Sequence, residues 1–174
     1  MNNATYRISH IYKNIYISDL YYSYNVDRLN KHNIKAILYL GDGNKPGHVL
    51  KLYEDNNITH KFLKIKDMTS YNLSDSFNAS WEFLNEHVKK NYNILVHCKQ
   101  GISRSPTIVA HFLMRKMHEY NFHRKSAWDK SNERITGEIL ELIHINRPCS
   151  NPNKSFIRQL EKYEELNIQK YESV

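Results

Sequence analysis

Short apolar runs between polar breaks indicate buried strands along the chain. Residues 6–18 alternate between apolar and polar positions, which is typical of a strand with one buried face. Residues 36–40, 60–65 and 94–96 are further apolar runs of strand length. Glycine and proline within 41–47 interrupt the pattern, so we predict that the second of these strands is followed by a loop.

Apolar positions at helical spacing predict two helices before the last of these strands. The first ends near Asn33, and Asp19 is its expected N-terminal cap. The second covers 75–90 with Ser74 as its cap, and the aperiodic stretch 66–74 before it is expected to be an exposed loop. The apolar positions are Val26 and Leu29 in the first helix, and Phe77, Trp81, Leu84 and Val88 in the second.

Three more helices are predicted in the second half of the chain. Residues 108–117 are apolar on almost every side, which indicates a buried central helix. Two amphipathic stretches follow at 135–146 and 155–166, and Asn153 is the expected cap of the last one. Between them and the central helix lies a polar segment, 120–134, for which the pattern allows either a helical extension or a loop.

Length and cysteine content narrow the class of protein. A chain of 174 residues is expected to form one domain with a substantial core. Its two cysteines, Cys98 and Cys149, are too few for a disulfide framework and fit a reducing compartment. Residues 1–20 contain no apolar block of the kind found in signal peptides, and no run is long enough to span a membrane. We therefore expect an intracellular protein of the cytoplasm or nucleus.

The formal net charge of +7 points to an anionic partner or substrate. Lysine and arginine are scattered rather than gathered into one arm or stripe, so nucleic-acid binding is not favoured. A basic surface also suits an enzyme that attracts phosphorylated substrates.

The most informative stretch is 94–107, where a short apolar strand leads through a loop to the start of a helix at Pro106. The amino end of a helix gathers unpaired N–H groups and positive dipole charge, which makes it a natural anion site. Cys98 lies in this loop, where its thiolate form is expected to be favoured. Arg104 follows six residues later and can hold a tetrahedral oxyanion with two parallel hydrogen bonds.

The string HCKQGISRSPTIVA at 97–110 resembles the signature loop of cysteine-based protein phosphatases, and in particular that of the dual-specificity branch. The opening IYISDL and the string RPCSNPNKSFIRQLEKYE resemble other parts of that family, so the resemblance covers about 6–167. It implies an α/β fold with a central, mostly parallel, twisted sheet of about four to five strands flanked by helices. It also implies one catalytic domain over 1–174, with 120–134 as an insertion.

The resemblance implies a role for each residue of the loop. Cys98 would be the nucleophile, and Ser105 would stabilise its thiolate, cap the helix, or do both. His97 would orient the loop, although a plain core histidine is an equally simple interpretation. Gly101 allows the tight turn of the backbone. The expected phosphate-binding residues are Lys99, Gln100, Gly101, Ile102, Ser103 and Arg104.

The general acid implied by the resemblance is an Asp about thirty residues before the nucleophile. Asp67 has this position, five residues before Asn72, which we count as a supporting residue. Asp42 and Asp75 are poorer candidates because neither follows a strand in the right order. Arg147 is expected either at the pocket rim as a second cation or as a helix-end cap.

Several features outside this set are expected to take no part in the chemistry. Cys149 is interpreted as a bystander, and His118 and His123 as solvated side chains. No cofactor is expected, and no close His/Cys spacing suggests a metal site.

The sequence favours phosphorylated proteins as substrates over other phosphate esters. Lipid-directed relatives usually carry a further cation in the loop, where this chain has Ile102. RNA triphosphatase relatives usually read Asn-Arg-Thr-Gly where this chain reads Ser-Arg-Ser-Pro at 103–106. A phosphatase acting on RNA 5′-phosphate or phosphoinositide, and a phosphoprotein-binding pseudophosphatase, remain the alternatives. Pseudophosphatases usually lack the nucleophile, which is present here as Cys98.

Overall fold

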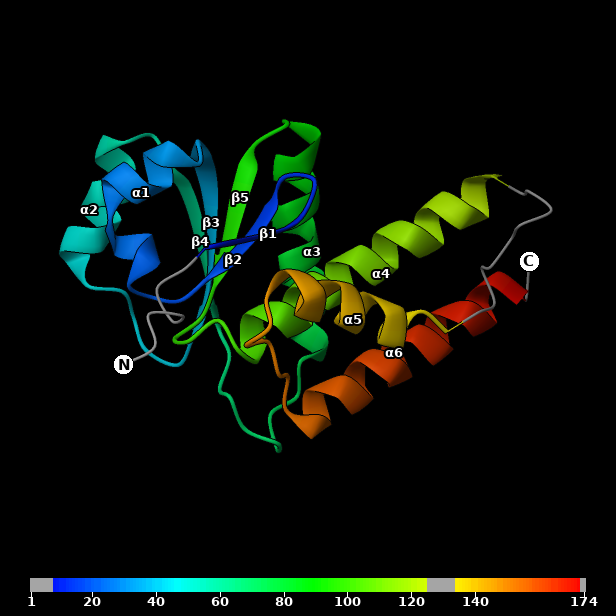
Figure 1. The fold of residues 1–174 in the computed structure, drawn as a ribbon. Coiled ribbons are helices and arrows are strands. Elements are labelled where there is room, and N and C mark those ends of the chain that lie inside the picture. Colours follow the sequence, from blue (N-terminus) through cyan, green and yellow to red (C-terminus); the bar gives the residue numbers. More distant parts are fainter. Residues whose placement is uncertain (1–7, 125–133, 173–174) are drawn as a thin grey trace.

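The five strands form one sheet in the order β1-β2-β5-β3-β4, as seen in a computed structural model that describes residues 8–124 and 134–172 (Figure 1). β1 pairs antiparallel with β2, and the remaining neighbours pair in parallel. The predicted α/β fold with a mostly parallel sheet is therefore confirmed. The strands are β1 (Ser9–Tyr12), β2 (Ile15–Ser18), β3 (Ile34–Gly41), β4 (Thr59–Lys64) and β5 (Asn93–His97).

Parallel pairing brings the carboxyl ends of four strands to one edge of the sheet. His97 at the end of β5 lies opposite Ser18 of β2 on one side and Tyr39 of β3 on the other. On the far side of β3, Gly41 lies opposite Lys64 of β4. The loops that leave these strands therefore meet at one place, which is where open parallel sheets generally bind their ligands. In Figure 1 this is the lower edge of the sheet.

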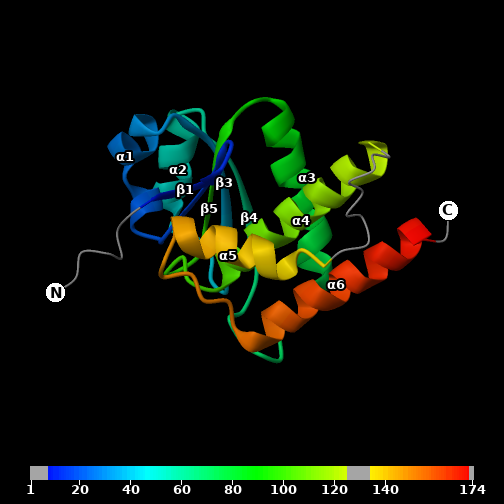
Figure 2. The same cartoon turned by 45° about the vertical axis from the view of Figure 1, so that its right-hand side comes forward.

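Helices cover both faces of the sheet (Figures 1 and 2). Alternate strand residues face opposite ways, so Leu95 packs into one core cluster while its neighbours Ile94 and Val96 pack into the other. The first face carries η2 (Tyr22–Tyr24), α1 (Val26–Lys31) and α2 (Gly47–Asp55). The second carries α3 (Ser74–Lys89), α4 (Arg104–Arg124), α5 (Thr136–Asn146) and α6 (Lys154–Glu172).

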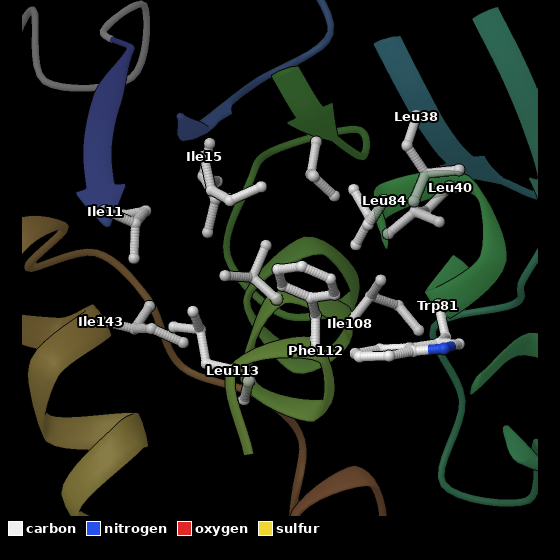
Figure 3. Packing of buried hydrophobic residues seen from close by; sticks show 14 of the residues in the cluster. Ile11, Ile15, Leu38, Leu40, Trp81, Leu84, Ile108, Phe112, Leu113 and Ile143 are labelled. Carbon is white, nitrogen blue, oxygen red and sulfur yellow. The ribbon is translucent and has the colours of Figure 1, made fainter. Parts of the chain in front are cut away.

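The larger core is built around α4, whose residues 104–114 are all buried. Figure 3 shows Ile108 and Phe112 between side chains of the sheet and Trp81 of α3. Leu113 lies near Ile143 of α5 in the same view. Complete burial of one such side chain stabilises the fold by about 1.5–3 kcal/mol. The prediction that α4 is a buried central helix is thus confirmed, and its rigid amino end fixes the signature loop.

Two element predictions near the amino end were wrong. The stretch 6–18 is not one strand within its described part, because β1 and β2 form a hairpin that turns at Lys13, where φ is 48°. The helix after it is capped by Asn25, whose side chain accepts from the Arg28 N–H. Asp19 instead accepts at 2.9 Å from the backbone N–H of Tyr22, the first residue of η2.

Two further corrections concern helix starts. α2 was not predicted, because its amphipathic pattern follows directly on the glycine and proline of 41–47, which are typical of a loop. Ser74 is the first residue of α3 and gives no side-chain cap; its N–H and hydroxyl both donate to Asn72 Oδ1, at 3.0 and 2.7 Å. The cap of α6 is confirmed, since Asn153 Oδ1 accepts from the Phe156 N–H at 3.0 Å.

The polar segment 120–134 begins as a helix, because α4 continues to Arg124. Residues 125–133 lie outside the described part of the chain. Within the described residues, none of the helices combines the length and the apolarity that a membrane crossing needs.

Candidate active site

Cys98 follows β5 directly and lies at the carboxyl edge of the sheet, with 1% of its surface exposed. Its Sγ accepts hydrogen bonds from the Gly101 N–H at 3.2 Å and the Ser105 hydroxyl at 3.4 Å. Two hydrogen-bond donors are therefore directed at the sulfur. The structure thus brings together the predicted nucleophile and the predicted thiolate-stabilising serine.

Six successive carbonyl groups, 98–103, accept hydrogen bonds from outside the loop. A trans peptide unit points its C=O and N–H in opposite directions. The N–H groups of 99–104 are therefore expected to face inward as a ring of donors around the Cys98 sulfur, and one of them, the Gly101 N–H, makes a hydrogen bond to that sulfur in the structure. The outer partners are the His97 ring, the Leu20 N–H, the Arg147 guanidinium, the Asn151 N–H, and the N–H and hydroxyl of Thr107.

Arg147 holds this loop from its outer side. Its Nε donates to the Gly101 carbonyl at 2.7 Å and its Nη2 to the Gln100 carbonyl at 3.3 Å, with 2% of the residue exposed. The second bond is made to the same peptide unit whose N–H meets Cys98 Sγ. Of the two expectations for Arg147, the helix-end position is the one the structure has: Arg147 is the C-terminal cap of α5, with its N–H on the Ile143 carbonyl. Its buried side chain is not a rim cation, because it donates to backbone carbonyls of the signature loop.

Arg104 is the first residue of α4 and is buried, with 7% exposed. Its Nη1 donates to the Ile65 carbonyl at 3.2 Å. Its Nε has no hydrogen-bond partner among the described residues and lies 3.5 Å from Asp67 Oδ2. A buried N–H without a partner is unfavourable unless an acceptor arrives. Arg104 thus keeps one buried N–H, on the side of the Asp67 carboxylate, that can donate to an arriving anion.

Asp67 lies in the loop after β4 and connects to the signature loop. Its Oδ1 accepts from the Ser103 hydroxyl at 2.7 Å and from Asn153 Nδ2 at 3.1 Å. The structure therefore places the predicted general acid, Asp67, next to Arg104 and the signature loop. Asp42 also approaches Arg104, at 3.9 Å from Nη1, but its side chain is 70% exposed. Asp75 is exposed in the first turn of α3.

A residue far along the chain fixes the loop that contains Asp67. Gln159 of α6 accepts from the Leu73 N–H at 2.7 Å and donates to the Tyr71 carbonyl at 2.9 Å. Asn72 supports the same loop indirectly by starting α3. Sequence reasoning missed both Gln159 and Asn153 in this role. Asn153 carried a signal as a helix cap, whereas nothing in the pattern of α6 distinguished Gln159.

His97 is completely buried at the end of β5. Its Nδ1 is 3.3 Å from the Cys98 carbonyl oxygen, its Nε2 is 3.0 Å from Lys45 Nζ, and Tyr39 stacks on the ring with centroids 5.0 Å apart. Burial, and then the charge of Lys45, hold the pKa of His97 well below its usual range. His97 therefore acts as a neutral hydrogen-bonding group. Lys45 and Tyr39 were not predicted as neighbours of the site.

The remaining predictions concern residues away from Cys98. His118 was expected to be solvated and is instead buried, with Nε2 3.4 Å from Glu164 Oε1. The side chain of His123 lies outside the described part of the structure. Cys149 is an exposed free thiol. In the described ranges, three or more His, Cys, Asp or Glu side chains do not gather into a group that could hold a metal ion.

Comparison with known proteins gives consistent matches. The family model for the dual specificity phosphatase catalytic domain matches residues 15–166. The tyrosine-protein phosphatase yvh1 of Schizosaccharomyces pombe is 38% identical over 110 residues, which are 63% of this chain and 29% of that protein. A probable dual specificity protein phosphatase of Dictyostelium discoideum is 31% identical over 161 residues, 87% of this chain and 61% of that protein.

The chain thus spans less than two thirds of the length of either curated relative. The crystal structure of the Yvh1 phosphatase domain from Chaetomium thermophilum matches with a TM-score of 0.74 at 23% identity, covering 92% of this chain and 96% of that one. At this level of identity the match shows a shared fold.

Proposed function

The chain belongs to the dual specificity phosphatase catalytic domain family, and on that premise we propose that it is a protein phosphatase acting on phosphotyrosine and on phosphoserine or phosphothreonine. The proposed catalytic unit is the single domain expected from the sequence. The observation that carries the proposal is the pair of donors on Cys98 Sγ, the Gly101 N–H and the Ser105 hydroxyl, at the start of a helix whose first residue is the buried Arg104. That arrangement fits a tetrahedral phosphoryl group bonded to sulfur.

In the proposed first step, the Cys98 thiolate attacks phosphorus, and the bond from phosphorus to the leaving oxygen breaks. The inward N–H groups and Arg104 stabilise the negative charge on the equatorial oxygens, and the loss of one such donor commonly lowers the rate by about 10²–10³. Asp67 gives its proton to the leaving oxygen. The products are a phosphocysteine, a free alcohol or phenol, and an Asp67 carboxylate that can take up a proton again.

In the proposed second step, water attacks phosphorus while the Asp67 carboxylate takes one of its protons. The S–P bond breaks and its electron pair returns to Cys98 Sγ. The Ser105 hydroxyl, 3.4 Å from that sulfur, stabilises the thiolate as it forms. Inorganic phosphate leaves, and both Cys98 and Asp67 return to their starting protonation states. The Asp67 side chain thus makes both proton transfers of the proposed mechanism.

A protein substrate is favoured by the surroundings of the loop. Exposed lysines adjoin three residues of the site: Lys66 precedes Asp67, Lys99 follows Cys98, and Lys154 follows the Asp67 partner Asn153. They provide an electropositive rim for a phosphorylated, acidic segment. The loop itself carries Ile102 where lipid-directed relatives usually have a cation, so phosphoinositides are less suitable ligands. RNA 5′-phosphate ends are less suitable because 103–106 reads Ser-Arg-Ser-Pro in place of Asn-Arg-Thr-Gly.

A phosphoprotein-binding pseudophosphatase is the alternative from a different functional class. Turnover of p-nitrophenyl phosphate in excess chelator separates the two, because only the enzyme releases nitrophenol. We expect wild-type protein to turn over, Cys98→Ser to be folded and inactive, and Cys149→Ser, the matched control, to keep the wild-type rate. Undetectable wild-type turnover, or activity that survives Cys98→Ser, would reject the proposed mechanism.

A further inference from the structure

Lys45 occupies a partly buried position on the first face of the sheet, next to the strand that ends at the nucleophile. Its ammonium lies over the rings of Tyr24, Tyr39 and Tyr53, at 4.9, 4.6 and 5.0 Å from their centroids. These tyrosines come from η2, β3 and α2, so the cage forms only in the folded protein. Ring faces attract a cation without neutralising it.

The hydrogen bonds of Lys45 match the protonated amine. Nζ lies 3.3 Å from Ser23 Oγ, 2.9 Å from Tyr53 Oη and 3.0 Å from His97 Nε2. The Ser23 hydroxyl proton is already used on the Leu20 carbonyl, and the Tyr53 hydroxyl proton on the Ser23 carbonyl. Both oxygens therefore present lone pairs to Lys45. An ammonium has three N–H donors, and here it meets three acceptors, none of which is a carboxylate.

The third acceptor is His97 Nε2, and the contacts of this ring determine which of its two nitrogens carries the proton. A carbonyl oxygen can only accept, so the 3.3 Å contact with the Cys98 carbonyl requires a proton on His97 Nδ1. In the neutral ring Nε2 then has no proton and accepts from Lys45. The contacts thus form one directed chain, from the Lys45 ammonium through the imidazole to the Cys98 carbonyl.

That carbonyl belongs to the peptide unit whose N–H, on Lys99, begins the ring of donors around the thiolate. We propose that Lys45 is a positioning residue: by donating to His97 Nε2 it selects the Nδ1–H tautomer, which holds the Cys98–Lys99 peptide in the orientation that phosphate binding needs. This proposal rests on the proposed phosphatase function for its effect on rate, but its effect on the tautomer is independent of that function.

The surroundings of Lys45 make its protonation state depend on pH in the neutral range. Burial lowers the pKa of Lys45 to about 7. The titratable groups that face it are Tyr24, Tyr39, Tyr53 and His97; burial raises the pKa of all three tyrosines, so none supplies a negative charge to balance the ammonium. A neutral Lys45 has two donors for three acceptors, so one contact is lost on deprotonation.

The direct test is the tautomer of His97, measured by ¹⁵N–¹H correlation spectra of histidine-labelled protein at pH 6. The His97 signals are assigned by their loss in His97→Asn. Wild-type protein should show Nδ1 protonated and Nε2 bare. Lys45→Met should shift His97 toward the Nε2–H form, and Lys45→Arg, which keeps donors on a cation, should retain Nδ1–H. Lys51→Met is the control, because Lys51 of α2 is exposed, and it should leave the spectrum unchanged.

The rate provides the second readout. Lys45→Met should lower kcat by about 2- to 13-fold, as expected for one net hydrogen bond, with KM changed less and with most of the rate restored in Lys45→Arg. If Lys45→Met does not fold, Lys45→Gln, which is too short to reach His97, replaces it with the same expectations. A folded variant that keeps the Nδ1–H tautomer, or that changes tautomer without lowering kcat, would overturn the proposal. An inactive wild-type protein would instead reject the phosphatase function, while the tautomer measurement would still decide the role of Lys45.

Discussion

Gly101 shows at the scale of one residue how closely the signature loop fits its surroundings. Its φ is +68°, and a Cβ on it would lie 2.5 Å from both the Ser18 carbonyl oxygen and Arg147 Nη2. A side chain would therefore strain the backbone and collide with the Ser18 backbone and with the Arg147 guanidinium, which holds the loop carbonyls. The freedom of glycine is needed here for the loop geometry itself.

We therefore expect Gly101→Ala to destabilise the fold by about 1–3 kcal/mol and to abolish most of the turnover. The matched control is Gly137→Ala in α5, where a Cβ would meet nothing within 4 Å; a helical alanine there should be neutral or stabilising by up to about 1 kcal/mol. Urea unfolding and initial rates on p-nitrophenyl phosphate measure both effects. A Gly101→Ala protein as stable and as active as the control would show that the loop tolerates a different conformation.

Asp67 gives a second prediction at this scale, because a general acid matters in proportion to the leaving group's need for a proton. Asp67→Asn should strongly slow the hydrolysis of phosphotyrosine peptides and alkyl phosphates. Formation of phosphocysteine from an aryl phosphate with an acidic phenol should be slowed much less. The control is Asp42→Asn, which removes the other carboxylate near Arg104. Equal slowing of this first step for good and poor leaving groups in Asp67→Asn would exclude Asp67 as the acid.

At the scale of elements, Glu164 joins three helices on the second face of the sheet. This buried carboxylate of α6 accepts from the Ile135 N–H at 2.6 Å and from the Thr136 hydroxyl at 2.6 Å, and so satisfies the amino end of α5. His118 of α4 approaches it from the other side. Burial alone would raise the pKa of Glu164, but the hydrogen bonds from His118, Thr136 and the backbone together lower it.

A lowered pKa in the folded state means that Glu164 stabilises the protein above the unfolded pKa and loses this contribution as pH falls through the folded one. Glu164→Gln should therefore reduce the free energy of unfolding by about 1–3 kcal/mol near pH 7, and the difference from wild type should shrink in acid. Urea titrations at several pH values measure this, with exposed Glu165→Gln as the control. A difference that stays constant down to the acid limit would contradict the assignment.

The same elements show what the sequence could reveal. Local apolar spacing made the parallel strands and α4 predictable. Cap chemistry made the Asn153 cap of α6 predictable. The start of α2 was hidden because a proline before a helix has the same local signature as a loop. His118 was predicted to be solvated because its neighbours in sequence are polar, whereas its burial depends on α5 and α6 packing over α4.

At the scale of the whole molecule, the site combines loops from every parallel strand. Cys98, Arg104 and Asp67 could be predicted since each has a fixed place relative to a strand end, and the resemblance assigned their roles. Lys45 and Arg147 act through residues that are 52 and 46 positions away in the chain. Their roles depend on tertiary contacts, so no pattern in the sequence indicated that Lys45 would donate to His97 or that Arg147 would donate to the loop carbonyls.

The central claim is that phosphate passes through a covalent bond to Cys98, and trapping that intermediate tests it most directly. In Asp67→Asn, p-nitrophenyl phosphate should still form phosphocysteine, because its leaving group needs little help, while the loss of the base slows the attack of water. Rapid acid quench followed by peptide mass spectrometry should find one phosphoryl group on the peptide that contains Cys98, and none in the Asp67→Asn, Cys98→Ser double variant. Nitrophenol release from Asp67→Asn without such a label, or a label on any other residue, would contradict the account.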